Sequence, residues 1–259
     1  MGTVAIETEQ LTKIYNMGKK NEIYAIKNLN LNIAKGEIYG LLGENGAGKT
    51  TTVRILTTMI KATSGLAKVF NNDVVTQSSR VRQFLGCLPQ DAGVYEEFSA
   101  IENLTFIAKL RGFEKEEIKS QLENLIYLVG LEDRQNDRVE TYSGGMKRRL
   151  MIARAMIGDP QILFLDEPTA GIDVLVSRRI REIIKKLAKE KNITVLLSTH
   201  DMMSAERLCD RVGILSKGVL VTEDTPSNII NKHSTENGDL EDAVVNIIGW
   251  KGDMDEVNR

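Results

Sequence analysis

The sequence predicts an α/β fold built on a parallel sheet, with an N-terminal antiparallel β subdomain and an inserted helical subdomain. Three observations support this prediction. An apolar run from Ile38 to Leu42 leads into the glycine-rich segment 43–51, after which apolar residues take helical spacing. Residues 3–42 have mainly the pattern of strands. From about residue 91 to 157 the apolar spacing is that of helices.

In the N-terminal part, apolar residues alternate with polar ones. Leu29, Leu31 and Ile33 alternate with three asparagines, which is the period of a half-buried strand. A turn at 63–65 predicts that another short strand begins there and covers 66–70. We expect these strands to form a sheet of antiparallel character.

The inserted helical subdomain is expected to contain three helices. Ser99 and Glu102 have the spacing of a capping box at a helix start. A second helix is expected to end at Gly130. A third, with Ile157 as its last apolar residue, is expected to stop at Asp159-Pro160.

Strand and helix patterns alternate again in the second half of the chain. Strands are expected at 162–165 and 194–198, with an amphipathic helix between them. This β-α-β order implies that the two strands are parallel. Residues 211–215 and 219–221 are expected to form a closing hairpin.

Composition places limits on function. The net charge of −2 over 259 residues gives no support for binding nucleic acid through a broad basic face. Cys87 and Cys209 stand alone, as free thiols do. We expect no signal peptide, and no apolar run approaches the roughly 18 residues that span a bilayer. We therefore expect a cytoplasmic protein, for which any membrane part must come from another chain.

The segment 43–51 has the phosphate-binding pattern G-x-x-x-x-G-K-[ST]. Its glycines allow positive φ values and bring backbone N–H groups close to an anion. Lys49 would carry its charge to the β- and γ-phosphates of a nucleoside triphosphate, and Thr50 would offer a hydroxyl to Mg²⁺. The N-terminus of the following helix adds its dipole. A glycine-rich turn that binds nothing is the alternative.

Two carboxylates end the apolar strand at 162–165. Asp166 is suited to hold Mg²⁺ together with the loop threonine, and Glu167 to polarise a water for attack on the γ-phosphate. An N-cap or a solvated turn is the alternative interpretation. The run Ser143-Gly144-Gly145 at a helix start is a second potential anion site, with a capped loop as its alternative.

Together these motifs resemble those of an ATP-binding cassette (ABC) ATPase, the nucleotide-binding subunit of an ABC transporter, whose core is a P-loop NTPase fold. Six motifs follow the family's order: the loop at 43–51, Gln90, the signature Ser143-Gly144-Gly145, the strand end at 162–167, Asp173 and His200. The implied ATPase domain covers residues 1–230. Residues 231–259 are expected to form a polar linker, at 231–241, and a helical tail that includes a short amphipathic helix from Leu240 to Trp250.

The resemblance implies roles around ATP and Mg²⁺. ATP would be bound by the loop residues Gly43, Asn45, Gly46, Ala47, Gly48, Lys49, Thr50 and Thr51. Mg²⁺ would be held by Thr50, Gln90 and Asp166. Glu167 would be the general base, assisted by Lys49 and Gln90, and His200 would contact the γ-phosphate. Tyr15 resembles the aromatic that stacks on adenine, with Tyr24 or an ordinary strand-end role for Tyr15 as alternatives.

Other roles implied by the resemblance involve contacts with a second chain. Ser143, Gly144 and Gly145 would bind the γ-phosphate held by the other protomer, and Asp173 would link the two sites. Met146 stands where the commonest signature has Gln, and it cannot donate the hydrogen bond that Gln can. The basic run 147–149 that follows is interpreted as a solvated helix face, with an anion or partner contact as the alternative.

The signature variant and the stretch 199–206 resemble one branch, the ATPase subunits of drug, sodium or polysaccharide exporters of the daunorubicin-resistance type. This implies ATP-dependent head-to-tail dimerisation with a second copy or a homologous ATPase subunit. It also implies a separate transmembrane permease that holds the protein at the inner face of the cell membrane. The alternative is a soluble ABC ATPase of the cofactor-assembly type. A P-loop kinase fits less well, because it leaves 143–145 and His200 without a role.

Overall fold

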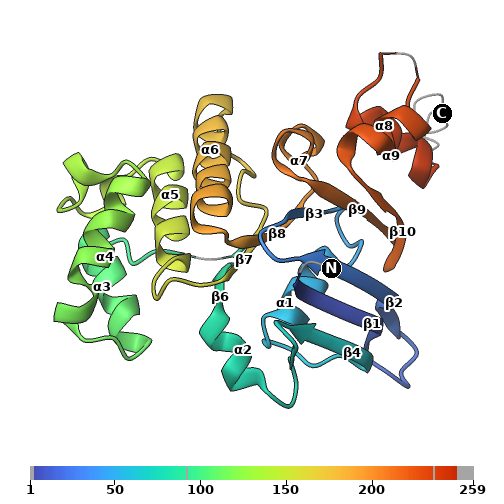
Figure 1. The fold of residues 1–259 in the computed structure, drawn as a ribbon, viewed down its shortest axis with the longest axis horizontal. Helices are drawn as coiled ribbons and strands as arrows, with labels where there is room; N and C mark the ends of the chain where they lie inside the picture. Colours follow the sequence, from blue (N-terminus) through green and yellow to red (C-terminus); the bar gives the residue numbers. More distant parts are fainter. Residues whose placement is uncertain (1–2, 92, 236, 250–259) are drawn as a thin grey trace.

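The computed structural model describes residues 3–91, 93–235 and 237–249 as two sheets and a set of helices (Figure 1). An antiparallel sheet lies at one side of the molecule, helices of residues 100–155 lie at the other, and a mainly parallel sheet lies between them. The P-loop NTPase architecture expected from the sequence is therefore present. Residues 250–259, the end of the expected helical tail, lie outside the described part of the chain.

The N-terminal strands form the predicted antiparallel sheet. Its order is β2 (Ile23–Ala34), β1 (Val4–Tyr15), β4 (Ser64–Val69) and β5 (Asn72–Asp73). Leu29, Leu31 and Ile33 are buried, whereas the asparagines that alternate with them are exposed. The period-two pattern thus identifies the face of β2 that packs inward.

The second sheet is parallel apart from its last strand. Its order is β10 (Val219–Asp224), β9 (Arg211–Ser216), β3 (Ile38–Leu42), β8 (Thr194–Thr199), β7 (Ile162–Asp166) and β6 (Leu85–Leu88). β10 and β9 form the predicted hairpin, and β9, β3, β8, β7 and β6 run parallel. The carboxyl ends of these five strands therefore meet at one edge of the sheet.

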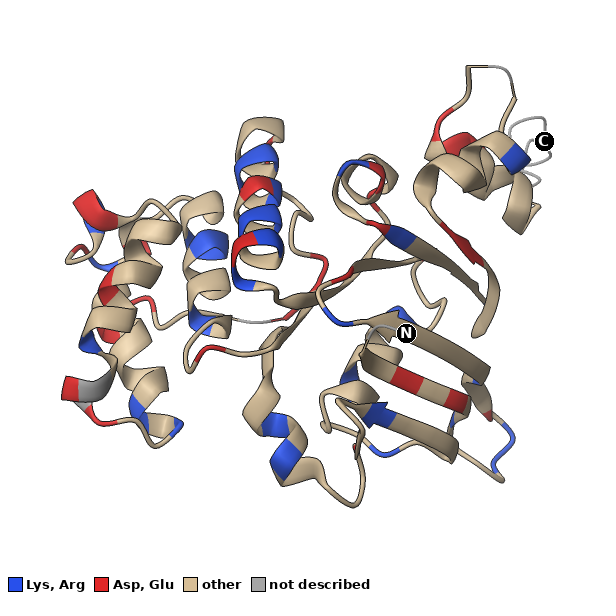
Figure 2. Cartoon of the chain, in the orientation of Figure 1, with Lys and Arg blue, Asp and Glu red and all other residues tan. Residues whose placement is uncertain are grey.

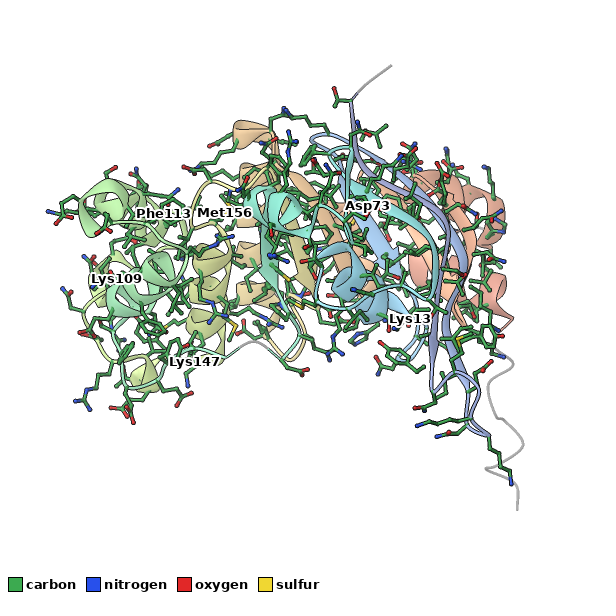
Figure 3. All side chains as sticks on the ribbon, turned by 90° about the horizontal axis from the view of Figure 1, so that it is seen from below. Lys13, Asp73, Lys109, Phe113, Lys147 and Met156 are labelled. Carbon is green, nitrogen blue, oxygen red and sulfur yellow. The ribbon has the colours of Figure 1, made fainter. Side chains whose placement is uncertain are left out.

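The helices of the first part of the chain lie beside the sheets or in the inserted layer. α1 (Lys49–Leu56) follows β3, α2 (Ser78–Phe84) precedes β6, and the inserted helices are α3 (Ala100–Leu110), α4 (Lys115–Leu128) and α5 (Gly144–Ala155). Two short 3₁₀ turns, η1 (Glu132–Arg134) and η2 (Val139–Thr141), connect α4 to α5. Figure 3 shows Lys109 and Lys147 of the inserted layer at the opposite end of the molecule from Lys13 and Asp73.

Local signals predict several of the ends of the inserted helices. Ser99 caps α3 with its hydroxyl, and the Glu102 side chain accepts the Ser99 N–H, as expected of a capping box. Gly130 follows α4 with a φ of 62°. The expected extent of the third helix is wrong, because α5 ends before Ile157. The chain leaves the helical conformation through Gly158, whose φ is 81°, and turns toward β7.

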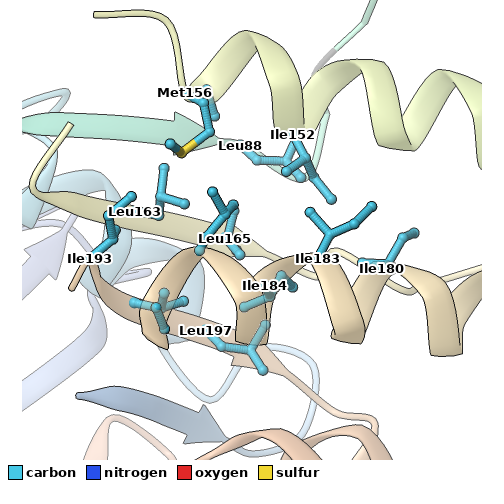
Figure 4. Close-up of a cluster of buried hydrophobic side chains, with 14 of the residues drawn as sticks. Leu88, Ile152, Met156, Leu163, Leu165, Ile180, Ile183, Ile184, Ile193 and Leu197 are labelled. Carbon is cyan, nitrogen blue, oxygen red and sulfur yellow. The ribbon is translucent and has the colours of Figure 1, made fainter. Parts of the chain in front are cut away.

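Alternate residues of the parallel sheet face two different cores. Leu163 and Leu165 of β7 pack among the helices, whereas Phe164 packs against α1 and the antiparallel sheet. Figure 4 shows the helical core between α5 and α6 (Val174–Lys191). A strand buried on both faces is continuously apolar, which explains why β7 shows no alternation in its sequence.

Three short helices remain, of which the first lies between β8 and β9 and the other two follow β10. They are α7 (Met202–Leu208), α8 (Pro226–His233) and α9 (Leu240–Ile248). The linker predicted at 231–241 is therefore too long, since α8 reaches His233 and α9 begins at Leu240. Leu240 and Ala243 are fully buried and belong to the helical core, so α9 packs on the body of the molecule. No helix in the described residues has both the length and the apolar character needed to cross a bilayer.

The burial of α9 leads to a stability prediction. Replacing Leu240 with Ala removes a fully buried side chain and leaves a cavity, so the free energy of unfolding should fall by about 2–5 kcal/mol. Urea denaturation measures this change. Val245→Ala on the same helix is the control, because Val245 is 37% exposed and its loss should cost much less. Equal and small effects of both substitutions would contradict the packing of α9.

Candidate active site

The turn between β3 and α1 has a shape that requires glycine at two positions. Gly43 has a φ of 152°, and a Cβ there would lie 2.2 Å from the carbonyl oxygen of Leu215. Gly48 has a φ of 109°, and a Cβ there would lie 2.3 Å from the carbonyl oxygen of Ala25. The backbone of β2 and β9 therefore packs closely against one side of the loop. Gly46, in contrast, has open space beside it, so the loop presents its backbone to a free side.

Lys49 begins α1 and turns its ammonium group back over this loop. Its Nζ donates to the carbonyl oxygens of Gly43 at 2.6 Å and Glu44 at 3.1 Å, and lies 3.9 Å from Oε1 of Glu167. Burial lowers the pKa of Lys49, while the charges of Glu167 and Asp166 act in the opposite direction. The site therefore holds a buried cation beside two carboxylates.

Glu167 is held by contacts to its backbone and to both carboxylate oxygens. Its φ is 50°, a left-handed conformation that costs a non-glycine residue about 1–3 kcal/mol. Its N–H donates to the carbonyl of Ser198 at 2.8 Å. Oε2 accepts the hydroxyl of Thr199 at 3.0 Å, and Oε1 lies 2.8 Å from Nδ1 of His200. Such strain is typical of functional positions, where surrounding contacts hold a side chain in place.

Asp166 lies one residue earlier, at the buried end of β7. It is 1% exposed and accepts a hydrogen bond from the hydroxyl of Ser198 on β8. The donor set predicted for a metal consists of this carboxylate, the Thr50 hydroxyl and the Gln90 amide oxygen. Hard oxygen ligands of this kind are those that Mg²⁺ prefers, so the chemistry of these residues fits the predicted ion.

A pocket of about 430 Å³ joins most of the predicted nucleotide residues. It is lined by residues that include Glu44, Asn45, Gly46, Gly48, Lys49, Thr50, Thr51, Gln90 and Glu167. Tyr15 and Tyr24 both lie on its wall, so the structure brings both candidate aromatics to the site. Each carries a lysine near its ring, with Nζ of Lys13 and of Lys27 at 5.2 and 5.5 Å from the respective ring centres.

The residues 143–145 do not line this pocket. Ser143 caps α5, its hydroxyl accepting the N–H of Met146 at 3.3 Å. Gly144 faces the loop 170–172 instead, and Asp173 caps α6 by accepting the N–H groups of Leu175 and Val176. Figure 1 shows α5 and α1 at separate places across the parallel sheet. Within one chain, the predicted site residues therefore divide into two groups.

The interpretation of 147–149 as a solvated helix face is wrong. Lys147 forms an ion pair with Glu96, and Arg148 donates to the carbonyl oxygen of Glu167. Arg149 donates to the carbonyl oxygens of residues 129 and 130. These basic side chains reach backbone and acidic groups of neighbouring segments because α5 packs among α3, α4, α6 and β6.

Sequence reasoning missed three residues that position Glu167. Ser198 and Thr199 supply a carbonyl and a hydroxyl to it, and Arg148 ties its carbonyl to α5. The hydroxyls directly before His200 were a usable signal, because β8 runs beside β7. Arg148 gave no such signal, since its partner is 19 positions away and belongs to another element.

Comparison with known proteins identifies the family of this chain. The sequence model described as "ABC transporter" matches residues 26–170. The bacitracin transport ATP-binding protein BcrA of Bacillus licheniformis is 40% identical over 223 residues, which are 86% of this chain and 70% of that protein. The daunorubicin/doxorubicin resistance ATP-binding protein DrrA of Streptomyces peucetius is 37% identical over 227 residues, which are 88% of this chain and 67% of that protein.

A solved structure has the same fold. The dimeric post-hydrolysis state of the ATP-binding cassette MJ0796, bound to ADP and Pi, matches with a TM-score of 0.76 and 29% identity. The match covers 85% of this chain and 98% of that chain. Family model, relatives and structure all identify the same family and the same fold. The chain therefore belongs to the ABC transporter family, as an ATP-binding cassette ATPase.

Proposed function

We propose that this chain is the ATP-hydrolysing subunit of an ABC exporter and that two copies share each active site. The observation that carries the proposal is the division of the site residues. The loop pocket collects Lys49, Thr50, Gln90 and Glu167, whereas Ser143 caps a helix on a separate surface. A second chain placed head to tail would bring its Ser143 over the loop and complete the site.

The residues of the loop pocket would bind and orient ATP. Backbone N–H groups of the loop and the Lys49 ammonium would hold the phosphates. Thr50, Gln90 and Asp166 would hold Mg²⁺, which neutralises charge on the phosphate oxygens when bound. Preorganised charges of this kind account for most of the catalysis in phosphoryl transfer.

Glu167 would take the proton of the attacking water. Its carboxylate is fixed by Thr199 and His200, so little reorganisation energy is needed when a water binds beside it. The side chain of His200 is 55% exposed, so the ring lies at the boundary between Glu167 and solvent. From there it would contact the γ-phosphate and respond to its loss.

The partner in the dimer would be a second copy or a homologous ATPase subunit. In support, the cassette MJ0796 was solved as a dimer with ADP and Pi. Ser143, Gly144 and Gly145 of the partner would bind the γ-phosphate, and Asp173 would link the two sites. Loss of the γ-phosphate would then remove the contact that joins the two chains.

Export and a membrane permease are the finer part of the proposal. BcrA and DrrA are named for bacitracin transport and for resistance to daunorubicin and doxorubicin. By analogy, this chain would lie in the cytoplasm, at the inner face of the membrane, attached to a separate transmembrane permease. The alternative is a soluble ATPase that works without a membrane partner.

The dimer leads to a prediction for Glu167→Gln. The glutamine keeps the shape and an acceptor oxygen but is a poor base, so hydrolysis should fall about 10²–10⁴-fold while ATP still binds. The variant should then accumulate as a dimer with MgATP, as measured by sedimentation. Glu190→Gln, on the exposed end of α6, is the matched control and should behave as the wild type. A Glu167→Gln protein that stays monomeric at saturating MgATP would contradict the shared site.

The permease leads to a second prediction. Affinity purification of the tagged chain from membranes extracted with mild detergent should recover a protein with several membrane spans. A tagged chain expressed without its genomic neighbours is the control for non-specific capture. Recovery of soluble partners alone would favour the cofactor-assembly alternative and remove the exporter assignment.

A further inference from the structure

A second pocket, of about 510 Å³, opens directly beside the phosphate loop. Residues 43–45 and His200 form its inner side. Its remaining wall comes from α7 and α9 and is largely apolar, through side chains that include Met203, Val245 and Ile248. Met203 is 57% exposed and Val245 is 37% exposed, so apolar surface here faces solvent in the single chain.

The same pocket has an acidic margin. Glu44 comes from the phosphate loop and Glu241 from the first turn of α9. Neither carboxylate forms an ion pair with another residue in the described part of the chain. A group that fills this pocket well would therefore be apolar with a positive charge at its edge.

The start of α6 offers the complementary surface. Val174 and Leu175 are 76% and 78% exposed, more than any other large apolar side chain among the described residues. Arg178 and Arg179 follow four positions later and so lie on the same side of the helix, one turn further on. Figure 2 shows the basic residues along α6. We call these four residues the α6 stripe.

The arginines of the α6 stripe are exposed, and neither has a strong ion pair within the described part of the chain. Arg178 pairs with Glu182 at 3.1 Å, but both side chains are well exposed, and such surface pairs are weak. Arg179 forms no ion pair among the residues that the structure describes, and its guanidinium lies beside Gly130. The stripe therefore joins exposed apolar area to positive charge, which is the combination that would complement the apolar wall and acidic margin of the pocket.

The α6 stripe is attached to the half-site that must come from the partner chain. It begins directly after Asp173, and the loop 170–172 before it faces the same pocket as Gly144. A Cβ on Gly145 would lie 2.5 Å from Cγ1 of Val176, so the start of α5 touches the start of α6. The segment 143–145 and the stripe thus form one surface, and the phosphate loop and the 510 Å³ pocket form another.

We propose that this pocket receives the α6 stripe of a second copy of the chain. The inference rests on the proposed head-to-tail dimer, because the surface that brings Ser143 to the phosphate loop also carries the stripe. By twofold symmetry the contact occurs twice per dimer. Apolar contact would come from Val174 and Leu175, and Glu44 and Glu241 would face the arginines. The helix α9, beyond the expected ATPase domain, thereby becomes part of the dimer interface.

A cross-link between two differently tagged chains tests this contact. One chain carries Leu175→Cys and the other Val245→Cys, each with Glu167→Gln to hold the dimer. With MgATP and a mild oxidant, the mixture should give a disulfide-linked heterodimer, and without nucleotide it should give little. Leu110→Cys replaces Leu175→Cys as the control, because Leu110 is 67% exposed but lies at the end of α3. Cys209 is buried, and the protein without added cysteines gives the background.

Charge reversal gives a second measurement on the same contact. Glu241→Arg should weaken the MgATP-dependent dimer at least tenfold, and adding Arg179→Glu should restore much of the loss. If the dimer forms with normal affinity but shows neither the cross-link nor the charge effect, the α6 stripe does not occupy the pocket. This result would overturn the inference. A Glu167→Gln protein that never dimerises overturns the shared site itself, and the docking with it.

Discussion

The parallel pairing of β3, β8 and β7 is the constraint on which the candidate site depends. Leu42 pairs with Thr199, and Asp166 pairs with Ser198, so the three strands end at the same level. Lys49, Glu167 and His200 each follow one of these ends. A lysine ammonium, a carboxylate and an imidazole from distant parts of the chain meet because the strands are neighbours in register.

That alignment also explains the conformation of Glu167. The residue must leave β7 while its N–H still bonds to Ser198, and the left-handed φ is the result. The two carboxylate oxygens then find fixed partners on β8 and beyond it, rather than water alone. Arg148 adds a bond from α5 to the Glu167 carbonyl, so the inserted helices are tied directly to the peptide that carries the carboxylate.

The part of the site that can be predicted from sequence is the part made by consecutive residues. The loop 43–51, the carboxylates after β7 and the capping box at Ser99 each combine spacing and chemistry within a few positions. Contacts between distant elements gave no such pattern. β6 has only four residues and no alternation, and the contact of Arg148 with Glu167 depends on how α5 packs. The amphipathic pattern from Leu240 predicts the helix α9, but its packing on the helical core through Leu240 depends on tertiary structure and could not be predicted.

The central claim is that one active site takes its loop from one chain and its signature from another. The most direct measurement mixes Lys49→Ala chains with Ser143→Arg chains, each inactive alone. The mixed dimer contains one site with both Lys49 and Ser143 intact, so a 1:1 mixture should recover up to about a quarter of wild-type ATPase activity. A mixture no more active than the separate variants, or an active Ser143→Arg protein on its own, would contradict the shared site.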